Sequence, residues 1–169
     1  DLNLDSLLES SKDIKEHNYV IQYLIECLEF LKITNYSKSP LKVTSFGDIS
    51  HLETLICSKI DNICPFDLLS ILHPSPAVCG SPTKEAMNWI NTLESFSRGN
   101  YASPIGWVDS EGNSEFRVAI RGARYIDYNL EFTAGSGIVK DSIAKKEIEE
   151  IQLKFKSLVK QIFIAKTTK

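Results

Sequence analysis

The sequence contains no long hydrophobic run and no basic block, and each absence argues against a class of protein. No stretch reaches the ~18 uninterrupted apolar residues of a membrane-spanning helix, and no signal-peptide pattern is visible, so we expect no membrane partner. The net charge is −3 at pH 7, with 19 Lys and Arg against 22 Asp and Glu. Because proteins bind nucleic acid chiefly through clustered positive charge, this balance argues against a nucleic-acid partner.

The sequence contains cysteines, but their spacing matches no known cysteine motif. The four cysteines are widely spaced and include no C-x-x-C pair; they are Cys27, Cys57, Cys64 and Cys79. Structural zinc sites and secreted disulfide frameworks have characteristic cysteine spacings that are not found here. We therefore expect neither, and we expect a reducing, cytoplasmic location.

Length and composition are those of an ordinary globular protein without internal repeats, low-complexity tracts or linkers. The chain has 169 residues, of which 43% are hydrophobic and 24% are charged. This is enough for one domain with a core, or for part of a larger domain. The chain begins at Asp1 without a methionine, and we expect it to be a piece of a longer protein.

Periodicity and turn residues predict a mixture of helices and antiparallel strands, which is an α+β fold. The predicted helices cover residues 12–31, 66–72, 144–164 and the stretch from Ser81 to just before Arg98. The predicted strands and extended segments cover residues 41–45, 48–56, 101–108, 115–125 and 130–134, the last three as an antiparallel meander. Residues 34–40 are rich in Asn, Ser and Pro and are predicted to be a loop.

Two of these elements have apolar faces that we assign to the interior. In the helix after residue 80, we predict Ser81 as the N-cap and Pro82 as the first helical residue. Its inward side chains are expected to be Ala86, Trp89, Ile90 and Leu93. In the strand over 115–125, the inward side chains are expected to be Phe116, Val118 and Ile120.

The helix over 144–164 carries a narrow polar stripe beside its apolar face. Glu147, Glu150 and Lys154 are three and four residues apart, so they lie on one side of the helix. The adjoining apolar stripe comprises Ile148, Ile151, Phe155, Leu158 and Ile162. Paired carboxylates can hold a hard divalent cation, and a lysine can hold a substrate carboxylate. The alternative is an amphipathic helix with a salt-bridged rim, which is the commoner origin of this spacing.

Three features elsewhere in the chain have related chemistry. Residues 133–138 form a small-residue turn whose bare backbone can approach a ligand closely. Glu16 lies at the edge of the apolar face of the helix over 12–31, so its carboxylate is either a solvated flank or a ligand directed into a cleft. His17, within that face, is most simply a hydrogen-bonded core histidine.

Seven short blocks follow one another in an order and at a spacing typical of one family. They are Lys-Asp-Ile-Lys-Glu-His at 12–17, Ile-Ser-His-Leu-Glu-Thr at 49–54, His-Pro-Ser-Pro-Ala-Val-Cys-Gly at 73–80, Tyr-Ala-Ser-Pro-Ile-Gly-Trp at 101–107, Val-Ala-Ile-Arg at 118–121, Ala-Gly-Ser-Gly-Ile-Val at 134–139, and Glu-Ile-Glu-Glu at 147–150 with Lys154. Together they resemble the C-terminal half of the chorismate-utilising enzymes, the fold of anthranilate synthase component I, and most closely the isochorismate synthases. The His-Pro-x-Pro-Ala-Val block favours isochorismate and salicylate synthases over the anthranilate branch.

The resemblance implies a magnesium site and a catalytic histidine. Glu16 and Glu150 match the family's magnesium-binding carboxylates, with Glu147 beside them, so Mg²⁺ is the implied cofactor. The metal would hold the ring carboxylate of chorismate. His51 matches a histidine near the hydroxyl that departs, whereas His73 is interpreted as structural.

The resemblance also implies residues that bind the substrate, chorismate. Arg121 and Lys154 match cations that hold its carboxylates, and Tyr101 matches an aromatic position beside its enolpyruvyl group. Backbone N–H groups would assist at Gly135, Ser136 and Gly137. Three positions depart from the family pattern: Ser75 replaces a threonine, Ser136 an alanine and Ile148 a tryptophan.

The implied function is that of an isomerase, the magnesium-dependent conversion of chorismate to isochorismate for menaquinone, phylloquinone or siderophore synthesis. The family's N-terminal half carries the lysine that activates water and the glutamate that protonates the leaving hydroxyl, and this sequence contains neither segment. We therefore expect residues 1–169 to be the C-terminal part of one chorismate-binding domain, inactive alone, with the N-terminal half as its partner. The alternatives are a salicylate synthase or another chorismate-utilising enzyme, and a non-catalytic fragment or pseudo-enzyme.

Overall fold

The computed structural model describes residues 5–46 and 49–164. Its helices are α1 Asp5–Glu9, α2 Ser11–Phe30, α3 Pro65–Leu72, α4 Pro76–Cys79, α5 Thr83–Leu93 and α6 Ala144–Ile164. Its strands are β1 Tyr36–Lys38, β2 Lys42–Phe46, β3 Ile49–Glu53, β4 Ile56–Ser58, β5 Pro104–Val108, β6 Ser114–Val118, β7 Ala123–Ile126 and β8 Asn129–Phe132. This mixture of helices and antiparallel strands is the predicted α+β class. None of the helices in these two ranges is both long enough and apolar enough to cross a membrane.

The N-terminal part of the chain packs around α2. Ser10 is its N-cap, and the Ser10 hydroxyl oxygen accepts a hydrogen bond from the Asp13 N–H at 3.3 Å, as the sequence predicted. The Tyr23 hydroxyl donates to the Ile71 carbonyl at 2.8 Å, which fixes α2 to the last turn of α3. The helix contacts α3, α4 and β3, and its buried side chains are Ile21, Cys27 and Leu28.

The strands form separate antiparallel pairs instead of one sheet. In the described part of the chain, β1 pairs with β4, β2 with β3, β5 with β6, and β7 with β8. The predicted meander is therefore wrong, because β6 does not pair with β7. The strand expected over 115–125 is broken at Arg121, whose backbone φ is +56°. A residue in the left-handed region cannot continue an extended strand, so two hairpins replace the meander.

The helix boundaries follow the local sequence signals more closely. The last helix, α6, has the predicted bounds, and each end of α2 lies one residue before the predicted end. The single turn α4 was not predicted. Pro82, and not Ser81, is the N-cap of α5, because the ψ of Pro82 is 141° and therefore extended.

The first strands differ from the prediction at one point. The predicted loop over 34–40 contains β1, whose partner β4 comes about twenty residues later in the chain. The predicted strand over 41–45 corresponds to β2. The extended segment predicted over 48–56 holds β3 and the start of β4, and its first residue lies outside the described residues.

Part of the apolar surface that the sequence assigned to the interior is exposed. Trp89 and Leu93 of α5 are 64% and 73% exposed, and Val118 and Ile120 are also exposed. These assignments are wrong, whereas the other expected inward side chains are half-buried: Ala86, Ile90 and Phe116. Periodicity located the apolar faces, but no described segment packs over the four exposed side chains.

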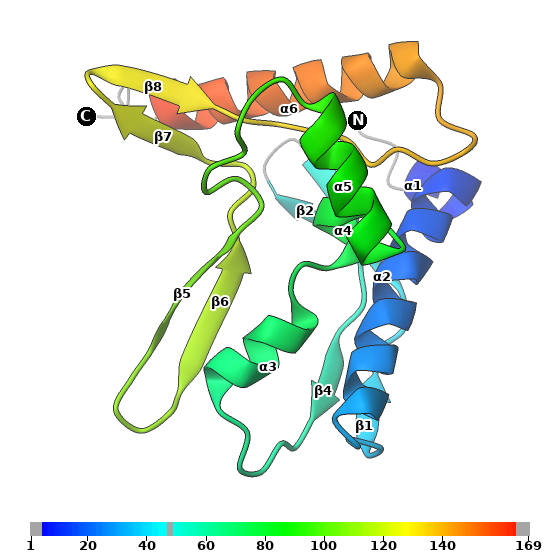
Figure 1. Cartoon of the computed structure of the whole chain (residues 1–169). Coiled ribbons are helices and arrows are strands. Elements are labelled where there is room, and N and C mark those ends of the chain that lie inside the picture. The colour runs from blue at the N-terminus through cyan, green and yellow to red at the C-terminus, as the bar shows by residue number, and fades with distance from the viewer. Residues whose placement is uncertain (1–4, 47–48, 165–169) are drawn as a thin grey trace.

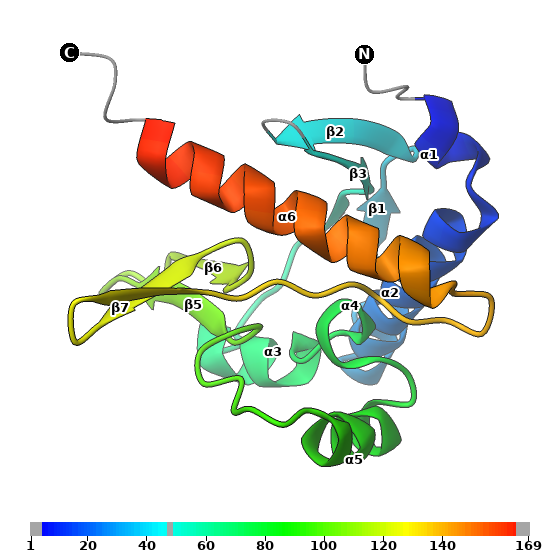
Figure 2. The ribbon, with the colours of Figure 1, turned by 90° about the horizontal axis from the view of Figure 1, so that it is seen from above.

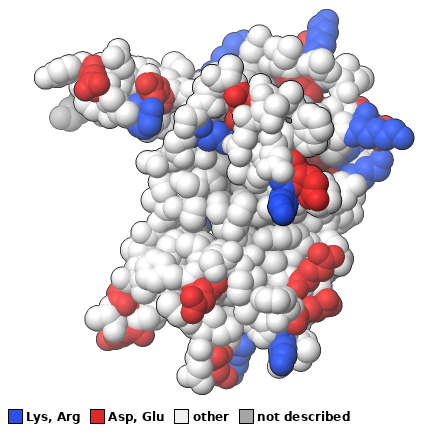
Figure 3. All heavy atoms as spheres, in the orientation of Figure 1, with Lys and Arg blue, Asp and Glu red and all other residues white. Residues whose placement is uncertain are grey.

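The helix α6 crosses one end of the molecule and brings distant segments together (Figure 1). Residues 133–143, which follow the β7–β8 hairpin, run back beside α6 to its first turn (Figures 1 and 2). That first turn lies against the start of α2, where Lys12 contacts Glu147. On the face shown in Figure 3, charged side chains gather toward the margins and few lie in the middle.

Replacing Ser10 by Ala is expected to lower the free energy of unfolding by about 1 kcal/mol, because the Asp13 N–H loses its acceptor. Urea denaturation followed by circular dichroism measures this change. Ser11→Ala, at the next and exposed position, is the matched control and should change the free energy by less than about 0.5 kcal/mol. Equal effects of the two substitutions would show that the cap adds no stability.

Candidate functional site

The polar stripe of α6 faces the interior, and part of its apolar stripe faces outward. Glu147 is only 5% exposed and the Lys154 side chain 17%, whereas Ile148 is 56% exposed. Leu158 is buried as predicted, but Ile162 is exposed, so the predicted apolar face is only partly inward. A solvated rim does not describe Glu147, because a carboxylate is buried only where a partner compensates for its lost hydration.

The partner of Glu147 is Lys12, from the first turn of α2. The Lys12 ammonium lies 2.7 Å from Glu147 Oε1, 3.5 Å from Glu16 Oε1 and 3.7 Å from Glu150 Oε2. Glu16 is one helical turn after Lys12, so both side chains leave α2 on the same side. Three carboxylates from two helices therefore surround one ammonium group.

The pKa shifts at this cluster reflect burial and the shared ammonium. Burial alone would lower the pKa of Lys12, but its bond to Glu147 and the charges of Glu16 and Glu150 raise that pKa above the ordinary value. Burial would raise the pKa of Glu147, yet its contact with Lys12 holds that pKa below the ordinary value. Burial raises the pKa of Glu16, and Lys12 opposes only part of the rise.

The small-residue turn lies against this cluster and against Lys154. Lys154 donates to the Gly135 carbonyl at 2.7 Å and pairs with Glu150 at 2.6 Å. A Cβ at Gly137 would come within 2.9 Å of a Glu16 oxygen, and one at Gly135 within 3.0 Å of the Tyr101 hydroxyl. Glycine therefore permits this close approach, whereas a Cβ at either position would push against the end of a neighbouring side chain. The Ser136 hydroxyl is buried and lies beside Glu147, whose pKa it helps to lower.

A second contact joins His51 of β3 to Arg121. Arg121 Nη2 lies 2.9 Å from His51 Nε2. Because a guanidinium can only donate, Nε2 accepts, and neutral His51 carries its ring proton on Nδ1. Burial lowers the pKa of His51, and the positive charges of Arg121 and Lys154 lower it further. The left-handed backbone of Arg121 that breaks the strand thus belongs to a residue of the site.

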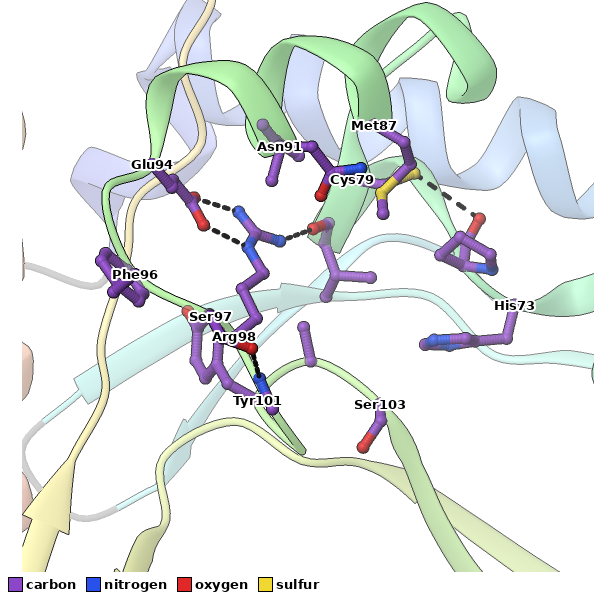
Figure 4. Close-up of a pocket in the computed structure, with 15 residues that line it drawn as sticks. His73, Cys79, Met87, Asn91, Glu94, Phe96, Ser97, Arg98, Tyr101 and Ser103 are labelled. Carbon is purple, nitrogen blue, oxygen red and sulfur yellow. Dashed lines mark hydrogen bonds and ion pairs between the residues drawn. The ribbon is translucent and has the colours of Figure 1, made fainter.

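The loop before β5 holds Tyr101 in place through a residue that sequence reasoning missed. Arg98 forms a two-point ion pair with Glu94 at 2.6 and 2.8 Å and donates to the Val78 carbonyl of α4 at 2.8 Å. Its guanidinium carbon is 5.8 Å from the centre of the Tyr101 ring, and Figure 4 shows Arg98 between Glu94 and Tyr101. The sequence signal that could have indicated this ion pair is the spacing of Glu94 and Arg98, which are four residues apart.

These residues border a cavity of about 530 Å³ between α4, α5 and the loop that follows. Its lining includes Tyr101 but none of the carboxylates around Lys12. His73 lines it as well, and burial lowers the pKa of that histidine. Burial likewise raises the pKa of the Tyr101 phenol. The cavity therefore does not contain the carboxylate cluster; Tyr101, which also lies near Gly135, is the member of its lining closest to the small-residue turn.

The structure brings the predicted site residues into one polar network. Its contacts run from Tyr101 to Gly135, Lys154 and Glu150, and then through Lys12 to Glu147, Glu16 and Gly137. The pair of His51 and Arg121 adjoins it, since the charges of Lys154 and Glu150 act on His51. Lys12 was not predicted as a member, although it stands in the first of the seven blocks.

His17, as expected, is hydrogen-bonded, to Thr54 at 2.9 Å.

The network lies within a sequence that matches a family model from one end to the other. The model, described as chorismate binding enzyme, matches residues 2–163. The chain belongs to the chorismate-binding enzymes. The resemblance drawn from the seven blocks is thereby confirmed.

Relatives of this member of the family include isochorismate synthases. The vibriobactin-specific isochorismate synthase of Vibrio cholerae is 33% identical over 156 residues, and isochorismate synthase MenF of Bacillus subtilis is 37% identical over 159 residues. These matches cover 91% and 90% of this chain but only 40% and 33% of the relatives. The crystal structure of DhbC from Bacillus anthracis superimposes with a TM-score of 0.88 and 31% identity, over 94% of this chain and 43% of that one. The chain therefore spans less than half the length of these relatives.

Replacing Arg121 by Met is expected to raise the pKa of His51, because a positive charge no longer faces the ring. The pKa should remain below the ordinary value, since burial still disfavours the imidazolium. NMR titration of the His51 ring signals measures the change. Arg124→Met, which removes an exposed arginine paired with Glu131, is the control and should leave the His51 pKa where it was. A His51 pKa unchanged by Arg121→Met would show that the two groups do not interact in solution.

Proposed function

We propose that this chain is the C-terminal part of the chorismate-binding domain of an isochorismate synthase, the enzyme that converts chorismate to isochorismate. The observation that carries the proposal is the polar network that joins α2, the 133–143 segment and α6, with the His51–Arg121 pair beside it. Its cations and carboxylates are of the kinds needed to hold a substrate with two carboxylates. The isochorismate synthases among its relatives support the same assignment.

The three carboxylates around Lys12 would hold Mg²⁺. Carboxylate oxygens are preferred ligands of this ion, and Glu16, Glu147 and Glu150 approach one point. Glu16 Oε1 and Glu147 Oε2 are both buried, and Glu16 Oε1 faces the Lys12 ammonium at 3.5 Å, so buried carboxylate oxygens already surround a positive charge there. The donor chemistry therefore fits Mg²⁺, which would neutralise and orient the ring carboxylate of chorismate.

The cationic groups of the network would hold the carboxylates of chorismate. Arg121 keeps N–H groups beyond the one that faces His51, and a planar guanidinium can bind a carboxylate at two points. Lys154 is fixed by Gly135 and Glu150, so its charge stands at a defined place and loses little entropy when a substrate binds. Backbone N–H groups over 135–137 lie beside it.

Two side chains would border the reacting part of the ring. Neutral His51 would lie near the departing hydroxyl, with its orientation set by Arg121. Tyr101, whose ring lies against the Arg98 guanidinium, would lie beside the enolpyruvyl side chain. In the reaction water adds at one ring carbon as a hydroxyl leaves another, and we assign the groups that move those protons to the N-terminal half of the domain.

Three observations support a domain of which this chain is one part. The chain covers less than half of its relatives, and large apolar side chains of α5 and β5 are exposed: Trp89, Leu93, Ile105 and Trp107. The paired strands also leave free edges, which a folded domain would pair or cover. We infer that the remaining half of the domain packs against these surfaces.

Replacing Glu16 or Glu150 by Gln is expected to weaken Mg²⁺ binding at least about ten-fold, because each change removes a charged oxygen ligand. Isothermal titration of the complete enzyme with MgCl₂ gives the affinity, and steady-state assays should show the loss of most activity. Glu149→Gln, on the exposed side of α6, is the matched control. If the magnesium affinity were unchanged in both site variants, Glu16 and Glu150 would not be metal ligands and would only form salt bridges at the edge of their helices.

Replacing Arg121 by Lys in the complete enzyme is expected to weaken chorismate binding by about 1–3 kcal/mol, the value of a charge-assisted hydrogen bond. The charge remains, but the planar two-point contact is lost. A chorismate titration followed by tryptophan fluorescence measures the affinity. Equal affinity for the two proteins would leave Arg121 as a partner of His51 only.

The chain by itself is expected to show no isochorismate synthase activity. Its own residues supply anchors, while loss of general acid or base help costs about 10²–10⁴-fold for each group. The assay incubates the chain with chorismate and Mg²⁺, alone and mixed with the N-terminal half as a separate chain, and separates isochorismate, salicylate and pyruvate by chromatography. Turnover by the chain alone would contradict the expectation. Salicylate with pyruvate on mixing would identify a salicylate synthase instead.

A further inference from the structure

The Lys12 ammonium occupies the point on which the three acidic side chains converge. Its nitrogen lies within 4.0 Å of Glu16, Glu147 and Glu150, and its side chain is only 26% exposed. These are the carboxylates to which the proposed function assigns Mg²⁺. One positive group therefore already stands where a second is expected to bind.

The carboxylates are spaced for an ammonium and not yet for a metal. Within residues 5–46 and 49–164, no three His, Cys, Asp or Glu side chains are grouped as metal ligands are. Mg²⁺ needs its oxygen ligands at about 2.0–2.1 Å, whereas an ammonium attracts them from about 2.7 Å outward. The oxygens of Glu16 and Glu150 lie 3.5 and 3.7 Å from the nitrogen. They would have to close in on a metal after the ammonium had left.

We propose that Lys12 is an internal counter-ion that competes with Mg²⁺ for these carboxylates, an inference that rests on the proposed magnesium site. In the metal-free chain, Lys12 offsets the repulsion among three buried or half-buried negative charges. When Mg²⁺ binds, the ammonium leaves the cluster, because two cations within one set of ligands repel each other. The flexible four-carbon stem of lysine allows this movement without a shift of α2.

The neighbouring lysine of the network is less suited to this role. Lys154 is held by the Gly135 carbonyl as well as by Glu150, so it keeps a partner when Glu150 turns to a metal. The ion pairs of Lys12 are all with the carboxylates that the metal would take. Lys12 is therefore the group that magnesium would release into solvent.

Lys15 offers a matched control on the same helix. It pairs at 3.1 Å with Asp141, and both side chains are exposed. Lys15→Met removes the same charge as Lys12→Met, three residues away, without touching the cluster. Lys12→Arg keeps the positive charge at the cluster itself. Comparison of the three variants thus separates the local charge from the net charge of the chain.

The first experiment titrates MgCl₂ into the complete enzyme, which contains these 169 residues, and into its three variants by calorimetry. Lys12→Met should lower the Kd for Mg²⁺ about ten-fold, because no charge-assisted contact has to be broken. Lys15→Met should change it less than about two-fold, since salt screens an exposed charge, and Lys12→Arg should not tighten binding. In EDTA, Lys12→Met should melt at a lower temperature than Lys15→Met and regain that difference with Mg²⁺.

The second experiment needs no substitution. An amine-reactive acetylating reagent is applied to the unchanged enzyme with EDTA or with saturating Mg²⁺, and tryptic peptides are quantified by mass spectrometry. Acetylation of Lys12 should speed up with Mg²⁺, whereas that of Lys15 should not. Most ligands protect the groups around them, so a faster reaction at this one lysine is the signature of release.

The outcomes separate this inference from the proposed function. Magnesium binding by the unchanged enzyme, with no tightening in Lys12→Met and no added acetylation at Lys12, would overturn the inference and keep the magnesium site. No magnesium binding by any of the four enzymes would overturn both. Tighter binding together with faster acetylation would establish the competition.

Discussion

The ammonium of Lys12 joins α2 and α6 by attracting carboxylates that would otherwise repel one another. Its closest contact, 2.7 Å to Glu147, links residues more than 130 positions apart in the chain. Removing one partner of a buried ion pair typically costs about 3–5 kcal/mol, because the other charge stays buried and unpaired. The turn beside α6, the approach of Gly137 to Glu16 and the anchoring of Lys154 all depend on these two helices meeting there.

Part of the buried surface of the chain is charged, while several large apolar side chains are exposed. Glu147 is buried and the next residue, Ile148, is exposed, and the aromatic side chain of Trp89 likewise lies outside. Burial of charge is unfavourable unless the charge is paired, and exposure of large apolar groups is unfavourable in water. Both features agree with the proposal that this chain is one part of a larger domain, in which the polar groups would meet a substrate and the apolar groups would meet protein.

Local signals predicted the helices well and the strand pairing poorly. The bounds of α6 and the Ser10 cap of α2 depend on residues three to four positions apart, which the sequence displays directly. Strand pairing depends on distant residues: β1 was taken for a loop because its partner β4 lies far along the chain. The break at Arg121 was missed because an arginine with a positive φ is held by its surroundings, here His51, and not by its own preference.

The sequence by itself indicated most of the helical segments, the family and the residues predicted for the candidate site, since periodicity and short blocks are properties of neighbouring positions. It did not reveal that Lys12 stands among the carboxylates, that Arg98 supports Tyr101, or that Glu147 is buried while Ile148 is exposed. Those facts belong to the tertiary structure. Distances between side chains on different elements, and the loss of water around them, are fixed only when segments far apart in the chain pack together, and these decide the charge state and partners of each group.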